Sequence, residues 1–293
     1  MLDFRTETFL TVCEYMNYTK AAEILNMTQP AISNHIHYLE NYYGTKLFTY
    51  NNKKLSLTAQ GKHLQKALQT LVHDELKLKN DLSKINPVKK YKIGATLSVG
   101  NSYLPDFISS YLDNHTDTEL SVTVANTATL LKKLDQGQLD IVLSEGYFSK
   151  NDYEHQVISN EPLAIFCGAK YETDEIHCLE DLFCHRLISR EQGSGTRAIF
   201  EHYLTEQGYS INNFQRKCDF TNLSLIIRML ISNRGISVLY KCVGSNLLEQ
   251  GKLKEITIKG FSLAHDFNAL WQKNSMYSYE NTEFVSELKD FIK

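Results

Sequence analysis

One group of polar residues has the types and spacing needed to read the edges of DNA bases. Residues 28–39 predict a helix whose apolar face consists of Ile32, Ile36 and Leu39. The opposite face carries Pro30, Ser33, Asn34 and His37. Hydroxyl and amide groups on such a face can form hydrogen bonds with bases in the major groove. Spacing alone fits equally well an ordinary helical hairpin packed inside a larger domain.

A second group of residues could bind a small anion. Short hydroxyl and amide side chains follow several predicted strands and begin predicted helices, at Thr96-Leu97-Ser98, Asn126-Thr127-Ala128-Thr129, Gly193-Ser194-Gly195-Thr196-Arg197 and Thr221-Asn222. Each junction offers free backbone N–H groups beside a side-chain donor. Helix capping explains any single junction, whereas several junctions that meet in one cleft favour a small carboxylate or comparable anion. For Arg197, a salt bridge on the helix surface is the favoured role.

The chain lacks the sequence patterns of common enzymes and cofactor sites. Gly193-Ser194-Gly195 does not have the Gly-x-Ser-x-Gly spacing of a nucleophile elbow, and Walker A, His-Glu-x-x-His and Gly-x-Gly-x-x-Gly motifs are missing. His177-Cys178 and Cys184-His185 could hold zinc, but the residues between them are typical of a hydrophobic core. We therefore predict a protein that is not an enzyme and needs no metal or cofactor.

The composition is that of a soluble protein with two or three domains. Of the 293 residues, 42% are hydrophobic and 22% are charged. No apolar run approaches the roughly 20 residues of a membrane-spanning helix, and the N-terminus lacks the basic start and apolar run of a signal peptide. We expect a cytoplasmic protein without membrane contact, whose six cysteines are free thiols.

Charge is distributed unevenly along the chain. Residues 1–90 contain 12 Lys and Arg against 8 Asp and Glu, a net charge of +4. Residues 91–293 contain 19 against 26, a net charge of −7. The overall charge of −3 by itself argues against a nucleic-acid binder. The division between the two parts instead fits a basic module that meets phosphate, joined to an acidic partner domain.

The elements around the polar helix are those of a winged helix-turn-helix. Two further helices are predicted before it, and Asn26-Met27-Thr28 provides the turn, in which Thr28 can cap the next helix. Pro30 fits the first turn of that helix and Gly44 ends it. Two alternating segments then flank Asn51-Asn52, a predicted hairpin turn. Such a hairpin is a wing that presents Lys53 and Lys54 to the DNA backbone or minor groove; a solvated surface hairpin is the alternative.

The rest of the chain predicts one long helix and an α/β region. Residues 58–85 have helical spacing and an exposed apolar stripe that we expect to pack against a second copy, and Asn86-Pro87-Val88 ends the helix. From residue 91 onward, predicted strands alternate with predicted helices. This order indicates a parallel sheet with helices on both faces, which binds ligands at the carboxyl ends of its strands.

The first 85 residues resemble the LysR-type transcriptional regulators. The matching positions, in order, are Phe9-Leu10, Thr19-Lys20-Ala21-Ala22-Glu23, Gln29-Pro30-Ala31-Ile32-Ser33, Leu39-Glu40, Gly44, Leu47-Phe48, Leu57-Thr58 and Gly61. The resemblance continues through the second half and implies an α/β protein overall. It implies a winged helix-turn-helix DNA-binding domain (1–57), a linker and dimerisation helix (58–87) and an effector-binding regulatory domain (88–293). The last would contain two Rossmann-like subdomains of periplasmic-binding-protein type, about 91–161 with 268–293, and about 162–267.

The resemblance also implies partners and site residues. Such proteins bind double-stranded promoter DNA as homodimers or homotetramers and respond to a small-molecule effector by altering DNA bending; RNA polymerase is a further candidate partner. The candidate DNA-binding residues are Thr28, Gln29, Pro30, Ser33, Asn34, His37, Lys53 and Lys54. The candidate effector-binding residues are Thr96, Ser98, Thr127, Thr129, Ser194, Gly195, Thr196 and Asn222.

Two features qualify this prediction. Asn34, His37 and Asn51 stand where the family usually has basic residues, so we expect weaker attraction to phosphate and more readout of base edges, for which asparagine suits adenine. The alternative function is a cytoplasmic small-molecule-binding protein of solute-binding type without a DNA function. The N-terminal module argues against that alternative.

Overall fold

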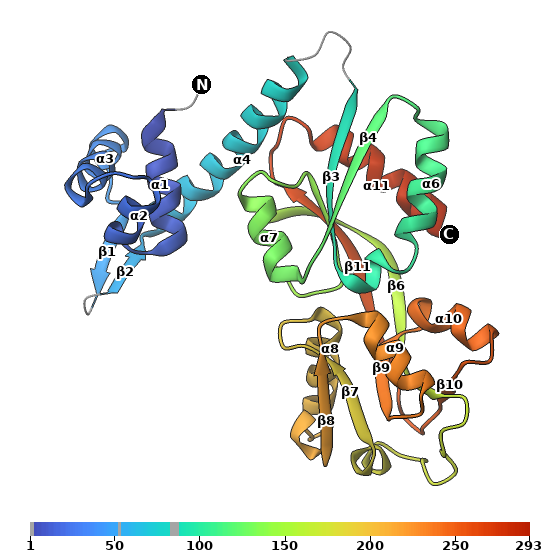
Figure 1. The fold of residues 1–293 in the computed structure, drawn as a ribbon. Coiled ribbons are helices and arrows are strands. Elements are labelled where there is room, and N and C mark those ends of the chain that lie inside the picture. Colours follow the sequence, from blue (N-terminus) through green and yellow to red (C-terminus); the bar gives the residue numbers. More distant parts are fainter. Residues whose placement is uncertain (1–2, 52–53, 83–87) are drawn as a thin grey trace. The chain divides into compact units, whose positions relative to one another are not determined.

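The structure, a computed structural model, describes residues 3–51, 54–82 and 88–293. The chain falls into two compact units (Figure 1). The first comprises residues 1–87, 135–138 and 272–277, and the second comprises residues 88–134, 139–271 and 278–293. Lys53 of the predicted wing and the predicted helix end at Asn86-Pro87 lie outside the described residues. Among the described helices, none is long and apolar enough to cross a membrane.

The first unit begins with the predicted helix-turn-helix and wing. Its elements are α1 (Phe4–Tyr15), α2 (Tyr18–Ile24), α3 (Gln29–Tyr43), β1 (Phe48–Asn51), β2 (Lys54–Leu57) and α4 (Ala59–Leu82). Side chains from the first three helices, the wing and α4 form the core, where Phe9, Ala21 and Ile32 are fully buried. β1 pairs antiparallel with β2, so the predicted hairpin is confirmed. Asn51, however, ends β1 and pairs with Lys54 instead of lying in the predicted turn, and Asn52 lies outside the described residues.

Local sequence signals fix both ends of α3. Thr28 Oγ1 accepts a hydrogen bond from the backbone N–H of Ala31 at 3.4 Å, and Pro30 lies in the first turn. Gly44 follows the last turn with a φ of 64°. Glycine adopts this left-handed conformation without the steric penalty of a Cβ atom. The predicted cap, first-turn proline and terminating glycine are therefore confirmed.

The second unit contains two α/β lobes (Figure 1). The first lobe contains β3 (Lys89–Ala95), α5 (Leu97–Gly100), α6 (Leu104–Asn114), β4 (Thr118–Val124), α7 (Thr127–Asp135), β5 (Ile141–Ser144) and α11 (Ser278–Ile292). The second lobe contains β7 (Arg186–Arg190), α8 (Gly195–Glu206), β8 (Arg216–Phe220), α9 (Leu223–Ile231), β9 (Ile236–Tyr240), α10 (Lys241–Glu249) and β10 (Leu253–Ile256), with 3₁₀ turns at Glu180–Cys184 and Ile211–Asn213. The long strands β6 (Tyr153–Gly168) and β11 (Leu263–Gln272) connect the lobes.

The strands of the second unit form a mixed sheet, in which the predicted parallel strands of each lobe are joined by antiparallel connecting strands. Within the described residues its order is β4-β3-β5-β11-β6-β9-β7-β8, with β10 beside β6. β3 is parallel to β4 and β5, and β7 is parallel to β8 and β9. β11 runs antiparallel to β5, and β6 runs antiparallel to β9 and β10. The antiparallel pairs arise where the two connecting strands join the parallel sheet of each lobe.

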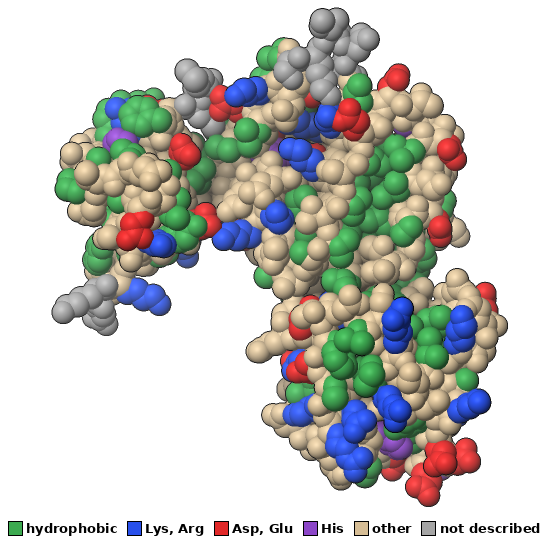
Figure 2. Space-filling view, in the orientation of Figure 1, with side chains coloured by type: hydrophobic (Ala, Val, Ile, Leu, Met, Phe, Trp, Pro, Cys, Tyr) green, Lys and Arg blue, Asp and Glu red, His purple; other side chains and the backbone are tan. Residues whose placement is uncertain are grey.

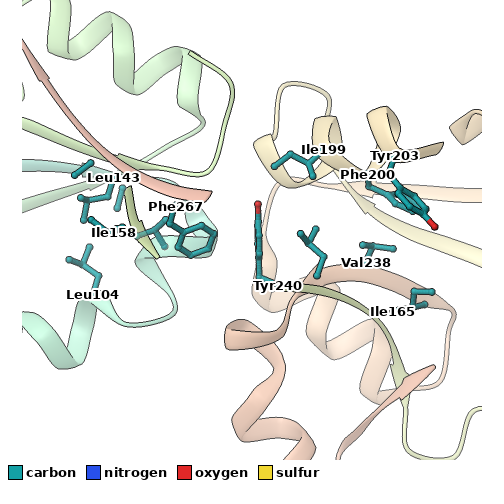
Figure 3. Packing of buried hydrophobic residues seen from close by; sticks show 14 of the residues in the cluster. Leu104, Leu143, Ile158, Ile165, Ile199, Phe200, Tyr203, Val238, Tyr240 and Phe267 are labelled. Atoms are coloured by element: carbon teal, nitrogen blue, oxygen red, sulfur yellow. The ribbon is translucent and has the colours of Figure 1, made fainter. Parts of the chain in front are cut away.

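One hydrophobic core extends through both lobes along β6 and β11. Its buried members include Leu143 in the first lobe and Val238 in the second. Between them, the ring of Tyr240 packs against that of Phe267 with centroids 4.7 Å apart, as Figure 3 shows. Both rings are fully buried. The carboxyl ends of β3, β5 and β9 are thereby held around one region.

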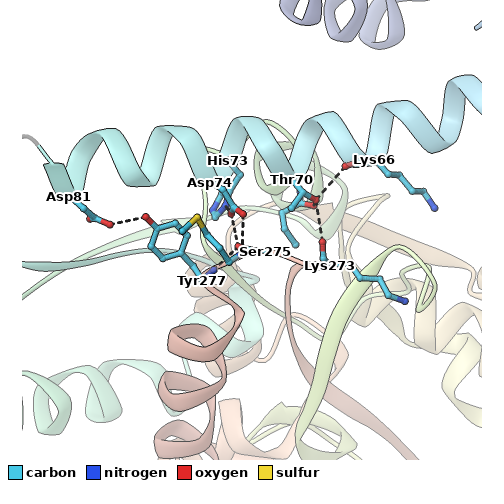
Figure 4. Close-up of polar contacts among 10 residues, drawn as sticks. Lys66, Thr70, His73, Asp74, Asp81, Lys273, Ser275 and Tyr277 are labelled. Atoms are coloured by element: carbon cyan, nitrogen blue, oxygen red, sulfur yellow. Dashed lines mark hydrogen bonds and ion pairs between the residues drawn. The ribbon is translucent and has the colours of Figure 1, made fainter. Parts of the chain in front are cut away.

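Polar contacts fix α4 to the segment 272–277 within the first unit (Figure 4). The Asp74 carboxylate accepts hydrogen bonds from Ser275 Oγ at 2.6 Å and from the backbone N–H of Met276 at 2.9 Å. The Tyr277 hydroxyl donates to Asp81 at 2.9 Å. The segment therefore joins the end of β11 to the start of α11 while it is bound to the long helix.

Candidate DNA interface and effector site

The exposed face of α3 carries the predicted DNA-reading side chains. Ile32, Ile36 and Leu39 are at most 5% exposed and hold the opposite face in the core. On the outer face, Ser33 is half-buried, and the exposed residues are Thr28, Gln29, Pro30, Asn34 and His37. Lys54 is exposed at the start of β2. A rigid helix that presents short polar side chains has the form required to read the major groove.

A buried carboxylate near the end of α3 fixes this helix to the wing. Glu40 accepts hydrogen bonds from the backbone N–H of Leu47 at 3.0 Å and from Lys46 Nζ at 2.6 Å. Burial favours the neutral acid, but the hydrogen bonds from Lys46 and from the amides of Leu47 and Phe48 outweigh it and hold the pKa of Glu40 below its usual value. Glu40 therefore remains charged at neutral pH and orients α3 relative to β1.

The predicted effector residues meet at the carboxyl ends of the strands in the second unit. Thr96 follows β3, Ser98 lies in α5 and Thr196 lies in the first turn of α8. Each is at most 3% exposed. Ser98 Oγ and Thr196 Oγ1 are 3.0 Å apart, in a hydrogen bond that joins the first lobe to the second. The predicted convergence of these hydroxyls is present.

The centre of this cluster is Glu145, which the sequence analysis missed. Thr96 donates its hydroxyl hydrogen to one carboxylate oxygen, and Thr196 Oγ1 donates to the other at 3.2 Å. Glu145 is 1% exposed and directly follows β5. The candidate residues were chosen because polar side chains directly follow a strand. Glu145 meets the same criterion. Its negative charge excluded it from a search for anion ligands.

Further predicted residues surround the cluster. Thr127 Oγ1 lies 2.8 Å from Ser144 Oγ, which also accepts the backbone N–H of Gly146 at 3.0 Å. Ser194 and Gly195 are buried at the start of α8. Gly195 packs so closely that a Cβ atom there would lie 3.0 Å from the Gly146 Cα. A side chain at residue 195 would push α8 away from the first lobe.

Two predicted effector residues are not brought into this cluster. Thr129 is exposed on α7, and its backbone N–H donates to Asn126 Oδ1 at 2.9 Å. Asn222 is exposed and caps α9 by accepting the N–H of Leu225 at 3.1 Å. At both positions the hydrogen bond is that of an ordinary helix N-cap: Asn126 caps α7, and Asn222 caps α9. Arg197 forms salt bridges with Glu201 and Asp219, as expected for a residue on the helix surface.

The possible zinc residues form other contacts. The backbone N–H groups of His177 and Cys178 donate to Asp181, and His185 Nδ1 lies 3.0 Å from the Tyr171 hydroxyl. In the part of the chain that the structure describes, no group of three or more His, Cys, Asp or Glu side chains could hold a metal ion.

Known proteins share both halves of this arrangement. The model of the LysR substrate binding domain matches residues 86–292, and that of the bacterial regulatory helix-turn-helix proteins of the lysR family matches residues 5–62. The chain belongs to the LysR family of transcriptional regulators. This LysR-type regulator has a helix-turn-helix DNA-binding domain and an effector-binding domain, so the match favours a regulator over a solute-binding protein without a DNA function.

Three relatives illustrate the likeness. The HTH-type transcriptional regulator CysL of Bacillus subtilis (strain 168) is 28% identical over 291 residues, which are 97% of this chain and 95% of CysL. Vibrio fischeri DarR, solved in complex with DNA, shares the fold with a TM-score of 0.56 and 21% identity over 99% of both chains. The regulatory domain of CcmR from Synechocystis PCC6803, solved with 2-PG, has a TM-score of 0.62 and 16% identity over 70% of this chain and 98% of that one.

Proposed function

We propose that α3 of this LysR-type regulator enters the major groove of double-stranded promoter DNA in the cytoplasm. We also propose that a small carboxylate or comparable anion, bound between the two lobes, alters promoter binding or bending. The observation that carries the second part is the meeting of the Thr96, Ser98 and Thr196 hydroxyls at one buried place. The structures of DarR with DNA and of CcmR with 2-PG support the two parts in turn.

Assembly through α4 would place two copies of α3 in successive major grooves. Leu71, Leu76 and Leu82 are exposed on α4, with Leu82 78% exposed. Figure 2 shows hydrophobic side chains gathered over the edge strand β4, where Val122 and Val124 are exposed. Two separate apolar surfaces fit a homodimer that associates further into a homotetramer. RNA polymerase remains a candidate partner once the DNA is bound.

Replacement of Ser33 or Asn34 by alanine should weaken specific DNA binding while the fold stays intact. Each substitution removes atoms from the outer face of α3 and none from its core. One contact with a base edge typically contributes about 1–3 kcal/mol to the discrimination between base pairs. Fluorescence anisotropy with the intergenic DNA upstream of its own gene and with random DNA, at the same salt concentration, measures the effect. Asn41→Ala, exposed farther along α3, is the matched control. Equal affinities for both DNAs in the wild type and the variants would contradict readout by α3.

The double variant Thr96→Ala, Thr196→Ala should lose effector binding. Both hydroxyls lie in the cluster between the lobes, and their loss also removes the hydrogen bonds to Glu145. A thermal-shift screen of small carboxylates identifies a ligand, and calorimetry then compares the variants. Thr129→Ala changes an exposed threonine of the same lobe and should leave binding unchanged. Unchanged affinity in the double variant would place the effector elsewhere.

A further inference from the structure

The cluster between the lobes contains a carboxylate that has no positive partner. Glu145 is 1% exposed. Its two oxygens accept hydrogen bonds from Thr96 and Thr196, and within residues 3–51, 54–82 and 88–293 no Lys, Arg or His forms an ion pair with it. A buried carboxylate is stable only when it is paired or well hydrogen-bonded. Two neutral hydroxyls leave part of its acceptor capacity unused.

Two buried hydroxyls beside Glu145 also have unused hydrogen-bonding capacity. Ser194 Oγ is buried at the N-terminus of α8 and has no hydrogen-bond partner. It does not cap the helix, so the first-turn N–H groups of α8 receive no bond from this side chain. The Tyr240 hydroxyl is likewise buried without a partner. Burial and the nearby Glu145 carboxylate raise the pKa of Tyr240, so its hydroxyl keeps its hydrogen and can donate.

These groups form two neighbouring regions of opposite character. The uncapped N-terminus of α8, with Ser194 and Gly195, attracts a negative group because of its free N–H groups and helix dipole. Glu145 attracts a positive group or a strong hydrogen-bond donor. A Cβ atom on Gly195 would lie 3.2 Å from the Cγ atom of Glu145, so the two regions are in direct contact. A molecule that fits both must carry opposite charges a few atoms apart.

We propose that the effector is an amino acid, whose carboxylate binds at the N-terminus of α8 and whose ammonium group binds Glu145. This inference rests on the proposed effector site and names the class of molecule that it takes. In the structure, Thr96 and Thr196 each donate one hydrogen bond to the Glu145 carboxylate, and the bond from Thr196 joins the two lobes. The ammonium group takes over these two acceptor oxygens, and the released hydroxyls can then bond to the carboxylate of the amino acid.

A simple anion fits this site less well than an amino acid. Like charges at short range repel strongly where water is excluded, and Glu145 lies against the hydroxyls that an anion would use. A purely structural role for Glu145 accounts for its own two hydrogen bonds. It does not account for the unpartnered hydroxyls of Ser194 and Tyr240.

The test compares amino acids with their 2-hydroxy acids, in which a hydroxyl replaces the ammonium group. The full-length protein is screened by thermal shift against the standard L-amino acids, and calorimetry then measures any ligand beside its 2-hydroxy acid. We expect the amino acid to bind about ten- to a hundred-fold more tightly, since a charge-assisted bond is worth about 1.5–3 kcal/mol. Glu145→Gln should remove most of that preference, because it weakens binding of the amino acid and removes the repulsion that opposes the 2-hydroxy acid.

Glu161→Gln is the matched control. Glu161 is also a buried carboxylate of this unit, but it is hydrogen-bonded to Tyr103. Its replacement should preserve the preference.

Binding of the 2-hydroxy acid shows that Glu145→Gln is folded. Equal affinities of the wild type for the amino acid and its 2-hydroxy acid would overturn the inference, as would an unchanged preference in Glu145→Gln. Even then, loss of 2-hydroxy-acid binding in the Thr96→Ala, Thr196→Ala variant would uphold the proposed effector site. If no amino acid binds, the inference fails, whereas another small carboxylate whose binding is lost in the Thr96→Ala, Thr196→Ala variant would still uphold the effector site.

Discussion

Replacement of Phe9 by alanine is expected to unfold the helix-turn-helix at temperatures at which the second unit remains folded. Phe9 is fully buried in the core of the first unit, and its ring packs against Phe48 with centroids 5.5 Å apart. It joins α1 to the first strand of the wing. Truncation of a buried phenylalanine costs about 3–5 kcal/mol through lost burial and the cavity left behind. The free energy of unfolding of a small domain is only about 5–15 kcal/mol, so this substitution removes a large part of it.

Calorimetry of the full-length protein tests this expectation. The first unit should melt at a temperature lower by about 10 °C or more, since 1 kcal/mol shifts a domain of 60–100 residues by about 4–8 °C. DNA binding should be lost at the same temperature, because the recognition helix depends on this core. Phe4→Ala is the matched control, since Phe4 lies on the same helix and is 59% exposed. An unchanged first transition in Phe9→Ala would contradict the assigned core.

The ends of the helices could be predicted from sequence because their causes are local. A cap acts through one side chain and an amide three residues away, as Thr28 and Ala31 demonstrate. A helix that ends at Gly44 needs only the left-handed conformation of that residue. Burial of Ile32 and Ile36 follows from their spacing along one helix. None of these features depends on distant parts of the chain.

Elements that depend on distant partners were missed or simplified. β8 contains only two apolar residues, Cys218 and Phe220, and it lies at the edge of the sheet, where it pairs only with β7 in the described structure. β10 is short and is held by β6, nearly ninety residues earlier in the chain. The direction of β6 and β11 relative to their neighbours follows from the passage between lobes. The local pattern of apolar and polar residues does not determine how a strand is directed relative to strands distant in sequence.

The effector site was predicted in part, for a related reason. A hydroxyl residue that begins a helix looks the same whether it caps the helix or binds a ligand. Asn222 proved to be a cap, whereas Thr196 reaches Glu145 across the lobes. Only the tertiary structure distinguishes them. Glu145 itself stood outside a search limited to groups that attract anions, although its place after β5 met the same positional rule.

Replacement of Asp74 by alanine is expected to release the segment 272–277 from α4. The carboxylate accepts the hydroxyl of Ser275 and the backbone N–H of Met276, and Ser275 Oγ in turn accepts the N–H of Tyr277 at 3.1 Å. Asp74 is 9% exposed. Hydrogen bonds to a charged group contribute about 1.5–3 kcal/mol each. Without this acceptor, Ser275 Oγ and the N–H of Met276 lose their partner, and the N–H of Tyr277 loses the orientation of its acceptor.

Hydrogen exchange measures the release directly. The amides of Met276 and Tyr277 should exchange about ten- to a hundred-fold faster in Asp74→Ala, because each tenfold change corresponds to about 1.4 kcal/mol. Asp74→Asn retains an acceptor oxygen and should show a smaller effect. Lys79→Ala changes an exposed position of the same helix and should show none. Unchanged exchange in Asp74→Ala would mean that other contacts, such as that of Tyr277 with Asp81, hold the segment.

The position of this segment gives Asp74→Ala a second expected effect. The segment runs from the end of β11 to the start of α11. A shift of β11 on effector binding would therefore displace this segment, which is hydrogen-bonded to Asp74 of α4. Asp74→Ala should therefore keep effector affinity and reduce the change in DNA affinity that the effector causes, which is typically about 1–3 kcal/mol for allosteric coupling. If the DNA response stays full while the segment exchanges faster, the direct chain connection after α4 must transmit the signal instead.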